Sequence, residues 1–391
     1  MPKVLHITDF GAVPDSAGLQ TVAIQRAIDA AAAGGGGIVH IPRGTFVSGT
    51  LRLASHLTLK LDEGALLLGS SNIADYDGRY WGGGFIVCAE LDGITIEGPG
   101  VIDGADCANP QGEEGFRGPH CIALANCTNV VVRDLTIRRS ANWAFNCVSS
   151  SEVRFERLHI RGGHDGIDAM NCRRMTFKDC DFRTGDDCIA GAGNHEFSFE
   201  GCYFNTSCNG LRLSCLGLVM RGCRFKGPGE AIHKATGKNE MLAAFVHFSP
   251  PDRAGCSGTQ PQSDEWLIED CTIEDVNQLY EFDHRTLWQN GRPVAHVTFR
   301  DVTATGLRKP IWVCGDTRRQ FHLTLERVRL ALPFGTWFHH PFVDLRSFDC
   351  LDVKGLTCVG VDDSHPAISV VDGIRIEVRD LTCEPPRRPA T

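Results

Sequence analysis

A motif of about 22 residues repeats along this chain and limits the folds it can adopt. In each copy apolar residues alternate with polar ones, which is the period of a β-strand with one buried face. One apolar position recurs in this way at Phe155, Phe177, Phe199 and Met220. The clearest copies span 153–160, 175–182, 197–204 and 218–225, and the pattern returns at 266–273, 297–304 and 323–330. Because one such repeat cannot bury its own apolar face, the repeats must stack on each other.

Two stacked architectures have strand-rich repeats of this length, a leucine-rich horseshoe and a parallel β-helix. The horseshoe requires leucine and asparagine at fixed positions and a helix-like segment in each repeat, and this chain has neither pattern. In a β-helix, strands of successive coils lie about 4.8 Å apart, so equivalent residues form ladders along the axis. One ladder is mainly cysteine and is predicted to fill the interior: Leu158, Cys180, Cys202, Cys223, Cys271 and Val302. We therefore predict an all-β fold, a single-stranded right-handed parallel β-helix.

The predicted domain is the whole chain, residues 1–391, with a helix covering its N-terminal end. Residues 21–33 read TVAIQRAIDAAAA, an alanine-rich amphipathic segment that runs into four glycines; glycine is a natural helix stop. The open end of a solenoid needs a cover, so we place an α-helical cap there, over about residues 20–34. Long excursions interrupt the period at about 76–92, 103–119 and 239–265. We expect them to form the walls of a groove, because insertions in solenoids tend to project on one face.

Composition excludes several classes of function. The chain has 39 Lys and Arg against 48 Asp and Glu, a net charge of −9, and no block of basic residues, so nucleic acid is not an expected partner. No run approaches the roughly 20 apolar residues that span a bilayer, so a membrane is not expected either. The 18 cysteines lack the paired spacings of zinc sites, and we interpret them as reduced thiols. Since no secretory signal is visible, we expect a cytoplasmic protein; the sequence gives no oligomeric state.

Two acidic segments lie one repeat apart, GHDGID at 163–168 and GDDCI at 185–189. The repeat aligns Asp165 with Asp187 on successive coils, with Asp186 beside them. Carboxylates this close repel one another when all are ionised, so the pKa of at least one should rise. Glycosidic cleavage requires a protonated acid beside an ionised base. A calcium site or a solvent-facing turn explains a single aspartate more simply, whereas an aligned group of three favours catalysis. A further acid, Asp168, fits a structural role equally well.

The two acidic motifs, the start ITDFGA at 7–12, the cap helix and IPRGT at 41–45 resemble glycoside hydrolase family 28. This is the polygalacturonase-like family of the pectin-lyase-like β-helix superfamily, and the resemblance covers roughly residues 5–235. Family members carry Asn-Thr-Asp, Gly-Asp-Asp, Gly-His-Gly and Arg-Ile-Lys on successive coils. The resemblance implies hydrolysis with inversion, with water and without a metal or other cofactor. It also implies that Asp186 is the general acid, and that Asp165 and Asp187 are bases that align the water.

The third and fourth motifs depart from the family pattern. Residues 208–210 read CNG in place of Gly-His-Gly, and residues 231–234 read AIHK where Arg-Ile-Lys is expected. Asn209 can orient a group by hydrogen bonding but cannot exchange a proton near neutral pH. Lys234 lies one position after the place of the family lysine, and Arg212 lies one coil before the place of the family arginine. In the family these two cations hold the carboxylate of a uronate, a group that arginine can bind with two hydrogen bonds. The predicted substrate-binding residues are His164, Asn209, Arg212, His233 and Lys234.

We expect an exo-acting hydrolase of an acidic or plant-derived oligosaccharide, in the manner of pectin degradation. The partner is then an oligosaccharide, and the excursions close one end of the groove. Two other classes stay open. A β-helix lyase or epimerase abstracts a proton α to a carboxylate and needs a basic residue there, whereas the aligned group is acidic. A non-catalytic carbohydrate-binding β-helix would keep its binding after loss of all three aspartates.

Overall fold

The computed structural model describes residues 3–78, 83–248, 265–286, 296–333, 340–362 and 366–385. The chain forms two compact units. The first unit is Met1–Asp186 with Ala231–Gly237, and the second is Asp187–Glu230 with Lys238–Thr391. The predicted single domain over 1–391 stays a prediction. No helix among these described ranges is both long and apolar enough to cross a membrane.

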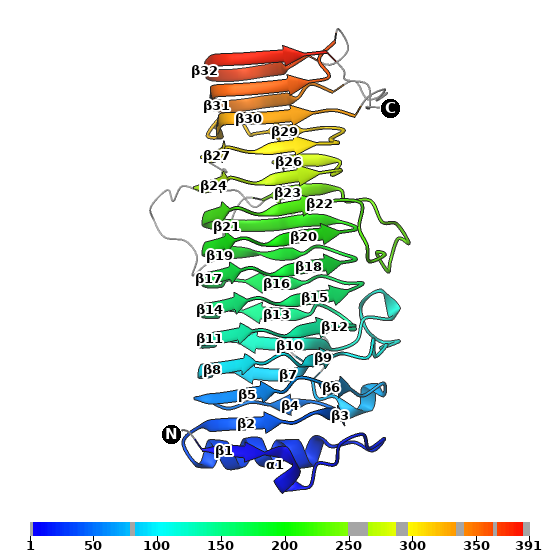
Figure 1. Ribbon diagram of the computed structural model, residues 1–391. Coiled ribbons are helices and arrows are strands. Elements are labelled where there is room, and N and C mark those ends of the chain that lie inside the picture. The colour runs from blue at the N-terminus through cyan, green and yellow to red at the C-terminus, as the bar shows by residue number, and fades with distance from the viewer. Residues whose placement is uncertain are drawn as a thin grey trace. The chain divides into compact units, whose positions relative to one another are not determined.

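The first unit is a stack of coils whose strands form three parallel sheets (Figure 1). The first sheet holds β1 (Val4–His6), β2 (Gly37–Ile41), β5 (Leu57–Leu61), β8 (Asp92–Glu97), β11 (Thr128–Arg133), β14 (Ser151–Glu156) and β17 (Arg173–Lys178). The second holds β3 (Gly44–Ser48), β6 (Ala65–Gly69), β9 (Val101–Asp103), β12 (Thr136–Arg138), β15 (His159–Gly162) and β18 (Asp181–Thr184). The third holds β4 (Leu51–Arg52), β7 (Gly84–Ala89), β10 (His120–Ala125), β13 (Phe145–Val148) and β16 (Ile167–Met170).

The second unit repeats the same construction, with several strands long enough to bend from one sheet into the next. Its strands are β19 (Ile189–Glu200), β20 (Tyr203–Thr206), β21 (Asn209–Arg221), β22 (Arg224–Lys226), β23 (Ala243–His247), β24 (Trp266–Glu269), β25 (Thr272–Glu274), β26 (Gln278–Asp283), β27 (Val297–Arg300), β28 (Thr303–Thr305), β29 (Ile311–Cys314), β30 (His322–Ala331), β31 (Val343–Val359) and β32 (Ile368–Glu384). Its described pairings are parallel throughout. The predicted parallel β-helix is therefore confirmed.

Residues one repeat apart in the sequence lie opposite each other on neighbouring strands. Phe155 of β14 lies opposite Phe177 of β17 in the first unit, and their rings stack with centroids 5.1 Å apart. Phe199 of β19 lies opposite Met220 of β21 in the second unit. All four side chains are buried. Each coil thus buries its apolar face against the next, which one strand-rich repeat cannot do alone.

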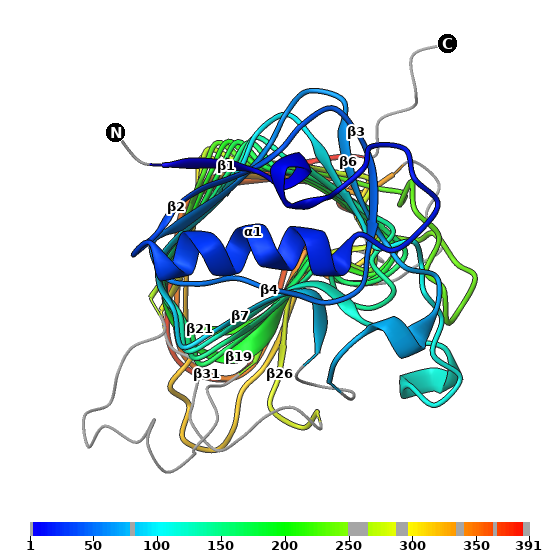
Figure 2. The same ribbon diagram turned by 90° about the horizontal axis from the view of Figure 1, so that it is seen from below.

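The predicted cap helix is α1 (Thr21–Ala33), and it covers the first coil of the first unit, as Figure 2 shows from below. Its buried face holds Ile24, Ala27, Ile28 and Ala31. Burying one isoleucine contributes about 1.5–3 kcal/mol, so this face alone holds the helix on the coil. The helix ends at the predicted glycines, where the backbone N–H of Gly36 donates to the Ala31 carbonyl over 2.9 Å.

The cysteines fill the interior as predicted. Of the 17 cysteines in the described ranges, 15 are buried, and only Cys383 is fully exposed. In the second unit the backbone N–H of Cys202 donates to the Cys223 sulfur over 3.4 Å, along the predicted ladder. Thiols at these positions act as small apolar side chains.

Two of the three predicted excursions contain a strand, and residues 79–82 of the first lie outside the described residues. Within 76–92 the short apolar run of residues 84–89 forms β7, a buried strand without the alternation that marks the other strands. Within 239–265 residues 243–247 form β23, and 249–264 lie outside the described residues. The stretch from β9 to β10 leaves the sheets as expected and holds the short 3-10 helix η3 (Glu113–Gly115). Two more such helices are η1 (Ile7–Phe10) and η2 (Ile73–Asp75).

Candidate active site

The predicted site residues fall into two groups, one in each unit. The first unit holds Asp165, Asp186, His164, His233 and Lys234, and the second holds Asp187, Asn209 and Arg212. The structure brings together the members of each group. The alignment of Asp165 with Asp187 stays a prediction.

A tight approach of two coils places Asp186. Strand β18 pairs with β15 so that Thr184 lies opposite Gly162, and the backbone N–H of Gly185 donates to the Gly162 carbonyl over 2.7 Å. A Cβ atom on Gly185 would lie 2.5 Å from the backbone oxygens of both Gly163 and Ile232. Glycine is therefore required there, because any side chain would force the two coils apart.

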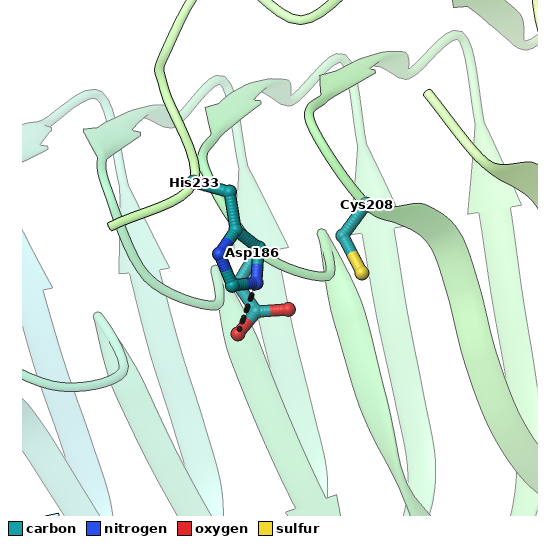
Figure 3. A group of neighbouring side chains, drawn as sticks. All are labelled: Asp186, Cys208 and His233. Carbon is teal, nitrogen blue, oxygen red and sulfur yellow. Dashed lines mark ion pairs between the residues drawn. The ribbon is translucent and has the colours of Figure 1, made fainter. Parts of the chain in front are cut away.

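Two nitrogens from separate segments lie next to the Asp186 carboxylate in the first unit. Nη2 of Arg117 lies 3.2 Å and Nε2 of His233 lies 3.4 Å from the same oxygen, Oδ2. Figure 3 shows the imidazole of His233 beside this carboxylate. The Asp186 side chain keeps 16% of its surface exposed, so solvent or a ligand can reach it.

Arg117 is the centre of the first-unit group, and the sequence did not single it out. Its side chain is only 8% exposed, and its other nitrogens donate to Glu114 over 2.9 Å and to Asn142 over 3.3 Å. Burial lowers the pKa of Arg117, but the hydrogen bond to Glu114 and the charges of Asp165 and Asp186 outweigh burial. The pKa of Arg117 is therefore raised above its usual value. One fixed cation therefore contacts Asp186 and acts on Asp165 through its charge.

His164 is a neutral imidazole in this group. It is 3% exposed and stacks on Phe116 with ring centroids 5.7 Å apart. Burial, together with the charges of Arg117 and Lys234, lowers the pKa of His164 to about 3. Its Nε2 atom is buried and has no hydrogen-bond partner within the described ranges. A neutral ring nitrogen of this kind suits a sugar hydroxyl, as donor or acceptor.

Lys234 is already engaged. Its Nζ lies 2.5 Å from Oδ1 of Asp106, and its aliphatic stem lies where a Cβ atom on Gly163 would be. Asp106, like Glu114 and Arg117, comes from the excursion between β9 and β10, which the sequence marked as a groove wall without naming site residues in it. The charged residues clustered in this excursion could have indicated site residues. However, these residues lie outside the repeat that aligned the other predicted site residues.

In the second unit, Asp187 has donors on both of its oxygens. Asn209 donates to Oδ1 from its side-chain amide over 2.8 Å and from its backbone N–H over 3.2 Å, while the Arg212 guanidinium pairs with Oδ2. The Asp187 side chain is 1% exposed. Asn209 therefore orients an acid, and Arg212, expected to hold a substrate carboxylate, holds a carboxylate of the protein.

One group of possible metal ligands lies in the second unit. Ligand atoms of Asp283, His284 and Cys314 are within 4.8 Å of one another. However, the Asp283 carboxylate accepts two bonds from the Arg285 guanidinium, and Nδ1 of His284 contacts the Cys314 carbonyl oxygen at 3.0 Å. These atoms are used within the protein, so the group gives no argument for a bound metal.

Part of the chain is similar to a known protein family. Residues 36–217 match the profile of Glycosyl hydrolases family 28. The resemblance to family 28 is confirmed. The matched part includes Asp165, Asp186, Asp187, Asn209 and Arg212, but it ends before His233 and Lys234.

Two curated relatives match this chain over part of their own length. The Exo-poly-alpha-D-galacturonosidase of Dickeya chrysanthemi is 29% identical over 49% of this chain and 43% of its own length. The Plasmin and fibronectin-binding protein A of Streptococcus pneumoniae is 34% identical over 63% of this chain and 37% of its own length. The chain thus spans less than half of either relative.

A solved structure supports the fold over nearly the whole chain. The hyperthermoactive Exopolygalacturonase from Thermotoga maritima matches 98% of this chain and 92% of its own, with a TM-score of 0.63 and 16% identity. At this identity the likeness concerns the β-helix alone.

Proposed function

We propose that this chain is a glycoside hydrolase that cleaves an O-glycosidic bond in an acidic or plant-derived oligosaccharide by an inverting, exo-acting mechanism. One observation carries the proposal: within the stretch that matches family 28, the buried guanidinium of Arg117 lies 3.2 Å from the Asp186 carboxylate, and its charge also acts on Asp165. The name of the Dickeya relative supports an exo-acting hydrolase of galacturonate chains.

The proposed chemistry needs an acid, a base and a water molecule. Asp186 gives its proton to the glycosidic oxygen as the bond to the anomeric carbon breaks. Asp165 takes a proton from the water, whose oxygen forms the new bond on the opposite face of the sugar, and the role of Asp187 as a second base stays a prediction. One proton is given and one is taken, so the acid and the base are each restored by proton exchange with solvent.

The first-unit group offers the sugar a neutral contact. His164 is uncharged near neutral pH, because its pKa lies at about 3, and its ring suits a hydroxyl. Lys234 and Arg212 each pair with a carboxylate of the protein. A uronate carboxylate bound at either cation would have to share it with that aspartate, which lowers the gain from the ion pair.

Product analysis with a panel of oligosaccharides tests the proposal. The panel contains oligogalacturonides, rhamnogalacturonan fragments and neutral oligosaccharides, with products followed by mass spectrometry and their anomeric configuration by NMR. We expect monosaccharides as the first products, released with inverted configuration. In Asp186→Asn, kcat should fall about 10²–10⁴-fold. Asp181→Asn is the matched control, because Asp181 is also an ion-paired acid of this unit but belongs to strand β18.

Other products would overturn the proposal. A product with an unsaturated ring, detected by its ultraviolet absorbance, would indicate a lyase. Retained configuration would exclude the inverting mechanism, and full activity in Asp186→Asn would exclude its role as the acid.

A second candidate, a binding protein without catalysis, has one observation in its favour. The pneumococcal relative, with the higher identity of the two relatives described, is named for binding plasmin and fibronectin. A binding protein would retain its affinity for oligosaccharide or protein after Asp165, Asp186 and Asp187 are all changed to asparagine. Calorimetry on this triple variant, with no turnover of any sugar by the parent, would favour this candidate.

A further inference from the structure

The partners of Asp186 come from two segments that the repeat does not align. Arg117 follows η3 in the stretch between β9 and β10, and His233 lies in the short segment 231–237. Both place a nitrogen within 3.4 Å of the same oxygen, Oδ2. Two separate segments thus meet at one oxygen of the proposed acid.

The hydrogen bonds of His233 fix where its proton lies. The backbone N–H of Thr236 donates to Nδ1 of His233 over 3.1 Å, so this nitrogen holds a lone pair. The neutral ring then carries its proton on Nε2. That is the nitrogen beside Oδ2 of Asp186, so His233 presents an N–H to the carboxylate.

Arg117 is held too firmly to be an adaptable surface partner. Its bonds to Glu114 and Asn142 and its contact with Asp186 use three different nitrogens of the guanidinium. A buried guanidinium with this many partners has little freedom to rotate, which is the property of a preorganised group.

We propose that Arg117 and His233 are positioning residues of the proposed hydrolase, which hold the side chain of Asp186 in one orientation. This inference rests on the proposed function. Both residues lie in segments outside the aligned coils.

The charged groups around Asp186 should affect how activity depends on pH. The groups of the first unit around Asp186 are Arg117, His233, His164, Lys234, Asp165 and Glu114. Arg117 is the cation in contact with it, and an opposite charge at this distance lowers the pKa of a carboxyl group by about 1–3 units. The general acid must be protonated, so its pKa sets the alkaline limb of the profile of kcat/KM.

Replacing Arg117 tests whether its charge affects the pKa of Asp186. In Arg117→Gln the pKa of Asp186 should rise, so the alkaline limb should move up by about one pH unit or more. Arg117→Lys keeps the positive charge and should leave the limb near its parent position, and it also carries the test if the glutamine variant does not fold. Arg161→Gln is the control, because Arg161 pairs with Asp181 on β15 and β18, with Nη2 2.7 Å from Oδ2. A limb that stays in place in Arg117→Gln overturns the inference.

Variants of His233 test orientation. His233→Leu removes the N–H and should lower kcat about tenfold or more with little change in KM, since orientation of an acid acts on the chemical step. His233→Gln restores an N–H and should recover part of the loss. His159→Leu is the control, because Nδ1 of His159 lies 3.7 Å from the carboxylate of Asp181 in the parent protein. This variant should change neither kcat nor KM. Equal effects of His233→Leu and His233→Gln contradict the inference.

A titration that needs no turnover separates this inference from the proposed function. With aspartate labelled at the carboxyl carbon, NMR follows each acid through pH, and Asp186→Asn identifies its signal. We expect the Asp186 signal to titrate at higher pH in Arg117→Gln than in the parent. If that shift is seen without hydrolysis of any sugar, Arg117 acts on Asp186 as inferred and the function is wrong. If hydrolysis is seen without the shift, the inference is wrong and the function stands.

Discussion

Asp186 and Asp187 are consecutive in the chain, yet different kinds of structure support them. Asp187 is held by Asn209 and Arg212, both on strand β21, which is part of the regular stack of the second unit. Asp186 is held in the first unit by Arg117 and His233, which lie outside the strands. The regular coils thus fix one acid deep inside the protein, whereas excursions hold the other where it stays partly exposed.

The largest expected effect separates the two acids by stability. Arg212→Leu takes the cation from a carboxylate whose side chain is 1% exposed, and breaking a buried ion pair in this way costs about 3–5 kcal/mol. Arg117→Leu should cost less, about 1–2 kcal/mol, because Asp186 and Glu114 are partly exposed and keep contact with solvent. Urea titration of both variants measures the difference in unfolding free energy. Equal losses would show that the supports of the two acids do not differ.

The neutral histidine of the first unit gives a pH dependence of stability. His164 has a pKa of about 3 in the folded protein against 6.5 as its ordinary value. The unfolded chain therefore binds a proton first, and stability falls as the pH drops from about 6.5 toward 3, by up to about 1.4 kcal/mol for each pH unit. Above pH 7 this residue has no such effect.

Thermal unfolding between pH 7 and pH 4 checks this expectation. His164→Gln keeps a polar side chain without the titration, so its stability should fall less steeply than that of the parent over this range. Parallel curves for the two proteins would show that His164 is not the group responsible.

The last expected effect concerns the close approach of backbone segments that places Asp186. In Gly185→Ala the new Cβ atom would contact two backbone oxygens at 2.5 Å, so the coils must separate slightly. We expect a loss of about 1–3 kcal/mol and a lower kcat, because Asp186 moves with the backbone. Gly222→Ala is the control for an added methyl group, since no atom lies within 4 Å of its Cβ position, although φ of +60° strains it. Unchanged activity in Gly185→Ala would separate the glycine from the site.

Much of the fold could be predicted from the sequence, because stacking makes it a local pattern repeated many times. The repeat aligned Phe155 with Phe177, and these residues are paired on neighbouring strands. The alanine-rich segment forms the cap helix. Strand β7 was missed because a fully buried strand has no alternation, and a short apolar run does not show on its own which structure it forms.

The site was predictable only where it follows the repeat. Asp165, Asp186, Asp187 and Asn209 could be proposed as site residues because their motifs recur with the repeat. Arg117, Glu114 and Asp106 were missed because their positions depend on how one irregular segment folds back, and no periodicity records that. The same limit explains Arg212 and Lys234: the sequence identified the cations, but their pairing with Asp187 and Asp106 depends on distances that spacing does not give.

The buried thiols affect how this protein must be handled. While the coils are closed, oxidants cannot reach most of them. An unfolded chain would expose them all at once, and thiolates close along a flexible chain form mismatched disulfides within seconds to hours. Heating in air should therefore be irreversible, whereas refolding in the presence of a reductant should recover the native chain.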